Sequence, residues 1–267
     1  MRLLIIFILT LAFLLVSCEK ELNFKYNDVE SQLVIEAILS EDGSTVSLSQ
    51  TVPMDDSLTM NQITDAVISV KDITENRTYI FAIDEKGIFY EGTPGIPGHE
   101  YGIEVTCNGK YYYSSCMMRQ PSYILSLDFQ WIKMPYDYVA VLQISFTDPT
   151  NTTDDCYWIR LYRNGESYMW LLSDDRKSVN GIISEVTMTS RKNISEEDEA
   201  TVLRDGDIVS VTVAPISREM YDYLTALQSD SNGPRMFEGD YCLGYFMAAP
   251  ISKSEIEYSP SEMKEYK

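Results

Sequence analysis

The sequence has little of what most catalytic and nucleic-acid-binding sites require. Its one histidine is His99, and it has no Cys-x-x-Cys pair, so an ordinary zinc site would lack ligands. Basic residues are also scarce, with 21 Lys and Arg against 41 Asp and Glu and a net charge of −20. Nucleic acids and anionic membrane surfaces bind basic patches, so neither is an expected partner. We expect no metal and no cofactor.

Catalytic motifs are missing as well. The chain contains no Gly-x-Ser-x-Gly elbow, P-loop or dinucleotide fingerprint. His99 lies in a turn before a strand, and no nucleophile is linked to it by sequence, which favours a surface histidine over a general base. The sequence therefore predicts a protein that is not an enzyme. The alternative is a hydrolase, because the 41 acids supply many carboxylate pairs.

No apolar run reaches the roughly 20 residues of a membrane-spanning helix. The longest covers residues 3–16, follows Arg2 and is interrupted at Thr10, as in the apolar region of a secretory signal peptide. It ends in Leu-Val-Ser-Cys at residues 15–18, which resembles the bacterial lipobox. The resemblance implies a signal peptide over residues 1–17 and an anchor of acyl chains, such as palmitate, on Cys18.

The residues after Cys18 indicate a compartment. Glu19 stands where Asp would mark the inner membrane of diderm bacteria, and residues 19–21 resemble the surface-export signal of Bacteroidetes lipoproteins. These resemblances imply a lipid-anchored outer-membrane protein on the cell surface, or otherwise on the periplasmic face. Residues 18–31 are mostly polar and are predicted to form a tether.

Four further cysteines allow up to two disulfides in an exported protein. Asn108-Gly109 predicts a two-residue hairpin turn, which sets Cys107 and Cys116 roughly 20 Å apart along the ladder. A disulfide needs Cα atoms within about 7 Å, so this pair should not form. Cys156 and Cys242 are left as a candidate disulfide, and free buried thiols are the alternative.

Apolar and polar residues alternate along most of the remaining chain, as they do in strands. The fold class is therefore predicted to be all-β. Short strands separated by turn residues predict an Ig-like or transthyretin-like β-sandwich over residues 32–119. After Gln120-Pro121, further strands predict a second, larger antiparallel β-sandwich or barrel-like domain over residues 120–252. The polar residues 253–267 are expected to fray.

One helix is expected, at residues 217–229 of the second domain. Ser217 is a good N-cap, and Met220, Leu224 and Leu227 form an apolar stripe at helical spacing. We expect this stripe to pack on a sheet.

Residues 65–105 resemble the carboxypeptidase-regulatory-like, or transthyretin-like, sandwich. The shared features are an alternating strand at 65–70, the turn Gly-Ile-Phe-Tyr from Gly87, and Pro-Gly-His-Glu-Tyr from Pro97. Gly87 and Gly98 suit turns with positive φ. The resemblance implies a spacer or binding platform without catalysis.

The chain from residue 18 to about 250 resembles a Bacteroidetes lipoprotein family, domain-of-unknown-function family 4249. The order of its motifs carries the resemblance: the lipobox cysteine followed by Glu, then Leu-Val-Ile-Glu from Leu33, Phe-Thr-Asp-Pro from Phe146, Tyr-Trp from Tyr157 and Leu-Gly-Tyr-Phe from Leu243. Family members often occur beside TonB-dependent outer-membrane receptors, which implies such a receptor as a partner. The resemblance carries over no catalytic residue.

Aromatic residues are abundant, with 19 Tyr, 9 Phe and 3 Trp. Strand alternation directs some of them outward, where rings stack on sugars or anchor protein partners. The candidate binding residues, for a glycan or a peptide, are Trp131, Trp158, Trp170, Tyr111 and Tyr113. The alternative is cross-strand packing.

Two short motifs remain. Acidic pairs such as Asp154-Asp155 and Asp174-Asp175 offer oxygen ligands for calcium, but none matches an EF-hand loop, which favours solvated loops. Asp56-Ser57-Leu58 resembles the Bacteroidetes O-glycosylation motif, which implies a glycan on Ser57; the alternative is an ordinary turn.

Three functions are consistent with these features. The first is a lipid-anchored accessory or binding lipoprotein that works with a TonB-dependent receptor. The second is a structural or adhesive surface protein, and the third is a hydrolase with an unrecognised carboxylate site.

Overall fold

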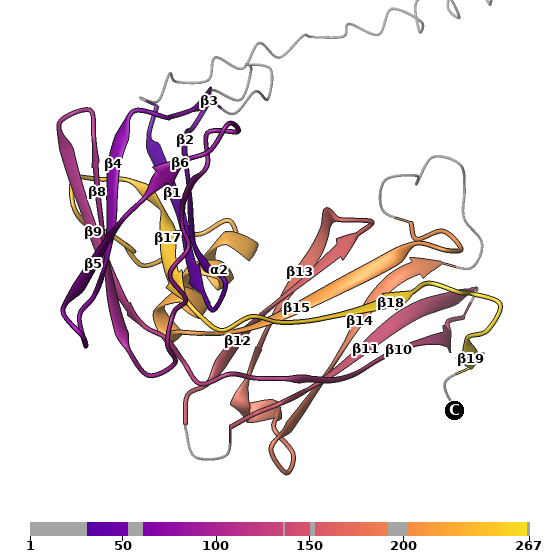
Figure 1. Cartoon of the computed structure of the whole chain (residues 1–267). Helices are drawn as coiled ribbons and strands as arrows, with labels where there is room; N and C mark the ends of the chain where they lie inside the picture. Colours follow the sequence, from indigo (N-terminus) through magenta and orange to yellow (C-terminus); the bar gives the residue numbers. More distant parts are fainter. Residues whose placement is uncertain (1–30, 53–60, 136, 150–152, 192–201, 266–267) are drawn as a thin grey trace, which may run out of the picture.

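The alternating pattern produces strands through most of the described chain, which covers residues 31–52, 61–135, 137–149, 153–191 and 202–265 of the computed structural model. The strands form two β-sandwiches, and the helix α2 (Arg218–Gln228) lies between them (Figure 1). The predicted all-β class is confirmed, and the second domain is a sandwich rather than a barrel. Within the described ranges, no helix is long and apolar enough to span a bilayer.

The first sandwich consists of two sheets. One has the strand order β17-β1-β2-β7-β6, with β3 beside β2, and the other has the order β16-β9-β8-β4-β5. The strands are β1 (Leu33–Ser40), β2 (Gly43–Gln50), β3 (Asn61–Gln62), β4 (Ala66–Asp72), β5 (Arg77–Ile80), β6 (Ala82–Ile83), β7 (Phe89–Glu91), β8 (Glu100–Cys107), β9 (Lys110–Met117), β16 (Glu238–Gly239) and β17 (Leu243–Ala248).

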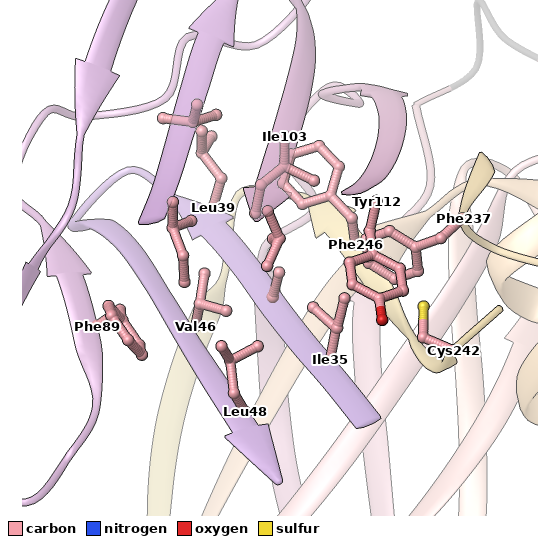
Figure 2. Close-up of a cluster of buried hydrophobic side chains, with 14 of the residues drawn as sticks. Ile35, Leu39, Val46, Leu48, Phe89, Ile103, Tyr112, Phe237, Cys242 and Phe246 are labelled. Carbon is pink, nitrogen blue, oxygen red and sulfur yellow. The ribbon is translucent and has the colours of Figure 1, made fainter. Parts of the chain in front are cut away.

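The core of the first sandwich follows from the alternation within each strand. Ile35 and Leu39 of β1 and Val46 and Leu48 of β2 point inward, where Phe246 of β17 joins them (Figure 2). Each fully buried side chain of this size stabilises the fold by about 1.5–3 kcal/mol. This cluster is therefore a main source of stability for the first sandwich.

The second sandwich has two four-stranded sheets, ordered β14-β11-β10-β19 and β13-β12-β15-β18. Its strands are β10 (Ile124–Lys133), β11 (Tyr138–Thr147), β12 (Cys156–Arg163), β13 (Glu166–Asp174), β14 (Ile182–Arg191), β15 (Ile208–Ile216), β18 (Ser252–Glu257) and β19 (Lys264–Glu265), with the short 3₁₀ helix η1 (Asp175–Lys177) after β13. Its core is rich in aromatic rings, among them Phe146 and Tyr157, which meet edge to face at 5.0 Å.

The strand β17 corrects the predicted domain limits. It falls within residues 120–252, yet it pairs in parallel with β1, from Val34 opposite Leu243 to Leu39 opposite Ala248. β16 likewise pairs with β9. The chain thus returns from the second sandwich to complete the first. Period-two alternation predicts that a strand forms, but it does not say which sheet the strand joins.

The C-terminal segment also differs from the prediction that residues 253–267 fray. β18 pairs antiparallel with β15, and β19 pairs in parallel with β10. Tyr258 is 3% exposed, and its ring meets that of Phe129 edge to face at 5.1 Å. Two isolated apolar residues, Ile256 and Tyr258, therefore dock a segment whose average composition is polar.

The helix α2 begins where the sequence predicts. Ser217 is the N-cap, and its hydroxyl accepts a hydrogen bond from the Met220 amide at 3.1 Å. Met220 and Leu224 are buried, but Leu227 is 51% exposed and Ala226 is buried in its place. The helix packs against residues of both sandwiches rather than on one sheet alone.

Candidate functional site

The structure brings together two of the five predicted aromatic residues, Trp158 and Trp170. They lie on neighbouring strands, β12 and β13, and their rings meet edge to face with centroids 6.2 Å apart. Trp131 instead lies in the core of the second sandwich, 6% exposed, and its Nε1 donates to the Pro260 carbonyl at 3.2 Å. Trp131 therefore packs in a core, as the alternative to a binding role for these aromatic residues predicts.

Tyr111 and Tyr113 are on the first sandwich and belong to a different surface. Both lie on β9, in the sheet that does not contain β17. The ring of Tyr113 covers Gly102 so closely that a Cβ at that glycine would be 2.9 Å from the tyrosine hydroxyl oxygen. Tyr111 is 45% exposed, and its amide donates to Asp240 at 2.9 Å. Tyr113 therefore packs across the strands, and neither tyrosine joins the two tryptophans.

The hairpin between β8 and β9 has the predicted register. Cys107 lies opposite Lys110, and Cys116 lies opposite Tyr101, so these two cysteines are well separated along the ladder.

The candidate disulfide between Cys156 and Cys242 is not formed. The structure has free thiols at both positions. Cys156 packs between the sandwiches, whereas Cys242 belongs to the core of the first sandwich (Figure 2). Burial raises the pKa of each thiol to about 12, which makes both unreactive. Cys18 and Ser57, the predicted lipidation and glycosylation sites, lie outside the described residues.

The two tryptophans are part of a larger group that we call the junction cluster, formed by Trp158, Arg160, Trp170, Tyr223 and Tyr245. The Tyr245 ring meets the Trp158 ring edge to face at 5.7 Å, and the Tyr223 ring lies 6.2 Å from that of Tyr245. The Cζ atom of Arg160 lies 4.5 Å from the centroid of the Trp158 ring. The cluster thus combines side chains from β12, β13, α2 and β17, and it spans both sandwiches.

Strand alternation positions the β12 residues of the cluster. Tyr157, Ile159 and Leu161 point into the core of the second sandwich. Trp158 and Arg160 lie between them in sequence, so they point to the opposite face of the sheet. That face meets α2 and the first sandwich, where Trp158 is 7% exposed.

Gly244 positions Tyr245. Its φ is +104°, which L side chains rarely adopt, and a Cβ there would lie 1.9 Å from the Ile35 carbonyl oxygen. The glycine therefore lets β17 approach β1. From this point the strand directs Phe246 into the core of the first sandwich and Tyr245 into the junction cluster.

Two hydrogen-bond donors of the junction cluster are buried without a partner. These are Nε1 of Trp158 and Nε of Arg160. An unpaired buried donor costs about 1–3 kcal/mol. The cation–π contact between the two side chains contributes about 0.5–2 kcal/mol, so it offsets only part of that cost. An acceptor bound to either donor would offset part of this cost.

The groups around the cluster keep its tyrosines neutral. Glu36 lies opposite Tyr245 in the β1–β17 register, and partial desolvation raises the pKa of its carboxyl. Burial, and then the nearby Glu36, raise the pKa of the Tyr245 hydroxyl, and burial is also the largest cause of the raised pKa of Tyr223. The cluster therefore offers neutral rings and one permanent cation, Arg160.

The hydrolase alternative predicts two close carboxyls with raised pKa values, and the described carboxyls with resolved shifts mostly have lowered pKa values. The guanidinium of Arg176 holds the pKa of Asp174 below its ordinary value. At Asp72 and Asp207, burial would raise the pKa, but hydrogen bonds to the ionised carboxylates outweigh it and lower the pKa. Glu36 is the described carboxyl whose pKa is raised.

His99 connects two turns of the first sandwich. Its Nδ1 lies 2.8 Å from Oδ2 of Asp72, and its side chain is 19% exposed, less than a surface histidine would be. Asp72 also accepts a hydrogen bond from the Glu75 amide at 2.9 Å. In the described part of the chain, no group of three or more His, Cys, Asp or Glu is placed to hold a metal ion.

Three members of the junction cluster, Arg160, Tyr223 and Tyr245, are missing from the residues that the sequence predicts. Arg160 follows Trp158 on the same face of a strand, and Tyr245 belongs to a motif that carries the family resemblance. Spacing alone could have paired Arg160 with Trp158. It could not have placed Tyr223 and Tyr245 beside them, because those residues come from other elements.

These features define a protein of two β-sandwiches whose junction is an aromatic cluster with unpaired donors. A family model described as Domain of unknown function (DUF4249) matches residues 19–255. The chain therefore belongs to the DUF4249 family.

A search of curated proteins finds no match. The crystal structure of dimeric latent PorU from Porphyromonas gingivalis is similar at 11% identity, over 83% of this chain and 20% of that one, with a TM-score of 0.21. This chain thus spans about a fifth of the length of that protein. At that TM-score the similarity carries no argument about function.

Proposed function

We propose that this DUF4249 chain is a lipid-anchored, non-catalytic binding lipoprotein of the outer membrane, whose junction cluster holds a ligand. The observation that carries the proposal is the pair of buried donors without partners, Trp158 Nε1 and Arg160 Nε, inside an aromatic cluster. Unpaired buried groups are rare in native proteins and call for an explanation beyond stability. A binding site for an acceptor-bearing ligand explains them.

The lipid anchor in this proposal rests on the lipobox at residues 15–18. Acylated Cys18 would be followed by a tether that ends near Leu33, where β1 begins. Thirteen extended residues reach about 40 Å, enough to hold the first sandwich clear of the lipid headgroups. The net charge of −20 favours the same separation, because anionic surfaces repel it.

The first sandwich is, in this proposal, a transthyretin-like platform. Gly87 and Gly98 have φ values of +78° and +91°, as the turns of that resemblance require. It contributes β17, and therefore Tyr245, to the binding surface.

A TonB-dependent receptor is the proposed partner, and a pull-down tests it. The tagged full chain is expressed in a Bacteroidetes host and recovered from detergent-solubilised outer membrane. We expect the wild type to incorporate labelled palmitate and to retain an outer-membrane receptor. Cys18→Ala is the matched control and should lose both. Palmitate labelling that survives Cys18→Ala would overturn the anchor, and a wild type that recovers no receptor would overturn the partner.

A structural role is the second candidate, because the junction cluster also holds the two sandwiches together. Apolar residues of α2, β12 and β17 share one buried cluster, as a rigid spacer would need. A spacer needs the rings but not the indole N–H. Trp158→Phe should therefore lower the stability of a pure spacer by no more than about 1 kcal/mol, and should impair ligand binding by a binding protein.

A further inference from the structure

The first sandwich contains a pocket that lies outside the junction cluster. It has a volume of about 280 Å³ and shares no lining residue with that cluster. We infer that this pocket binds a small primary amine, with the ammonium at Glu91 and a hydrocarbon body against the floor. The inference goes beyond the proposed function and does not depend on it, because the two concern different sites.

The pocket has both room and an opening. Its floor includes Leu39, Val70 and Tyr101, which come from both sheets and are 2%, 1% and 3% exposed. Leu39 is part of the core shown in Figure 2. The rim includes Arg77 and Ile96, which are exposed to solvent. Small-molecule sites have volumes of roughly 300–1,000 Å³, so this pocket suits a compact ligand.

Hydrogen bonds hold one wall of the pocket, residues 91–96, in place. The Gly95 amide donates to the Ser40 carbonyl at 2.8 Å. The Ile96 amide donates to the Tyr101 hydroxyl, also at 2.8 Å. The wall is therefore formed before any ligand binds, which lowers the entropic cost of binding.

Glu91 supplies a charge without a counterion. Its Oε2 accepts a hydrogen bond from the Thr93 amide at 2.9 Å, and its Oε1 accepts one from the Thr93 hydroxyl at 2.8 Å. Each carboxylate oxygen can accept two hydrogen bonds, so one position on each stays open. Among the described residues, no basic side chain forms an ion pair with Glu91, which is half-buried. An ammonium, which has three donors, can fill both open positions.

The other charges of the lining do not neutralise Glu91. Oδ2 of Asp72 lies 2.8 Å from Nδ1 of His99. Glu75 is paired with Arg77 at 2.9 Å, so the guanidinium at the rim is already engaged. The lining contains three carboxylates and one guanidinium, and the whole protein has a net charge of −20. The field in the pocket therefore favours a cation over an anion.

The floor selects a cation with a hydrocarbon body. Tyr79 and Tyr101 add aromatic rings to the aliphatic side chains of Leu39 and Val70. Aromatic faces attract an ammonium, and the apolar floor favours burial of the hydrocarbon part. A bare metal ion fits poorly, because no group of three or more His, Cys, Asp or Glu in the described chain is placed to hold one. A small primary amine matches both the charge and the floor.

The test is isothermal titration calorimetry of the full chain in detergent, with the heat of titration into detergent alone subtracted. The probe is phenethylamine. The controls are phenethyl alcohol, which has the same shape without the charge, and the anion phenylacetate. We expect the amine to bind at least about tenfold more tightly than the alcohol, and phenylacetate not to bind. Equal affinities for amine and alcohol would overturn the cation assignment, and no binding of the amine would overturn the site.

Two pairs of variants place the amine in the pocket. Glu91→Gln removes the charge and should weaken phenethylamine by about tenfold, whereas Glu85→Gln, at an exposed acid outside the lining, should change the affinity by less than about twofold. Ile96→Trp should fill the mouth and abolish binding, whereas Ile96→Ala should weaken binding by about threefold at most. Circular dichroism checks that each variant is folded. Wild-type affinity in both Glu91→Gln and Ile96→Trp would place the amine elsewhere and overturn the inference.

A last titration separates a free amine from a lysine side chain of a partner protein, since both carry a primary ammonium on an apolar stem. The probe is Nα-acetyl-lysine amide. We expect it to bind more weakly than phenethylamine, because its stem has no ring to meet Tyr79 and Tyr101. Tighter binding of the lysine derivative would overturn the free amine and assign the pocket to a partner's lysine.

Discussion

The core of the second sandwich and the junction between the sandwiches each bury a tryptophan, to 6% exposure at Trp131 and 7% at Trp158. Their polar atoms differ. Nε1 of Trp131 donates to the Pro260 carbonyl at 3.2 Å, whereas Nε1 of Trp158 has no partner. The two tryptophans are therefore buried to the same extent and differ in whether the indole donor has a hydrogen-bond partner.

The surroundings of the two rings differ in the same way. Trp131 is among the side chains of one sandwich, contributed by adjacent strands of its two sheets. Trp158 is in a cluster that two sandwiches and α2 build together, next to a cation. The described donor of Trp131 is paired within the core, whereas the junction leaves the donors of Trp158 and Arg160 unpaired at some cost in stability.

The largest expected loss of stability comes from a substitution at Gly244, which should disrupt the junction and leave the core of the second sandwich intact. In Gly244→Ala the new Cβ would lie 1.9 Å from the Ile35 carbonyl oxygen at a φ of +104°. Strain and the loss of β1–β17 pairing should cost about 3 kcal/mol or more. Chemical denaturation followed by circular dichroism measures the loss. Gly109→Ala is the control, with positive φ but no neighbouring atom, and a loss as large there would contradict the steric argument.

The same substitution at both tryptophans sharpens the comparison. Trp131→Phe leaves the Pro260 carbonyl without its donor and opens a cavity, so it should cost about 2–3 kcal/mol. Trp158→Phe opens a similar cavity but removes an unpaired donor, so it should cost about 1 kcal/mol or less. Urea unfolding of both variants measures the difference. Equal losses would mean that the Trp158 donor is satisfied in solution.

The sequence predicts local features of this fold well, for a physical reason. Strand alternation, the Asn108-Gly109 hairpin register and the Ser217 cap each depend on neighbours a few residues away. The partner of β17 does not, because β1 lies some 200 residues earlier in the chain. Any strand with two apolar faces could pair with β1 in this way. The sequence pattern therefore does not predict that residues 243–248 belong to the first sandwich.

The candidate site was predictable only in part for the same reason. Trp158 and Trp170 lie on adjacent strands, and alternation directs both outward. Tyr223 and Tyr245 reach them through a helix and a strand from elsewhere in the chain. The absence of a partner for Trp158 Nε1 depends on the complete packing, which composition and spacing do not determine.

Asp72 of the first sandwich is a buried polar group with hydrogen-bond partners, and it contrasts with the unpaired donors of the junction cluster. The pKa of Asp72 is lowered in the fold, because hydrogen bonds from His99 and the Glu75 amide outweigh the effect of burial. Its contribution is therefore present above the unfolded pKa of about 3.9 and is lost as pH falls through the folded value. Asp72→Asn should cost about 1–2 kcal/mol at pH 7, and the gap to wild type should close below about pH 4. Urea unfolding at a series of pH values measures it, and a gap independent of pH would contradict the ionic role.

The smallest expected effect tests how α2 supports the junction. Leu227 is 51% exposed although it continues the apolar stripe of the helix, while Leu224 is 2% exposed in the cluster between the sandwiches. Leu227→Ala should therefore change stability by no more than about 0.5 kcal/mol, and Leu224→Ala should cost about 2–5 kcal/mol. Thermal unfolding compares the two. A large loss at Leu227 would show that a partner covers this face of α2, and the junction cluster would then extend beyond the five residues assigned to it.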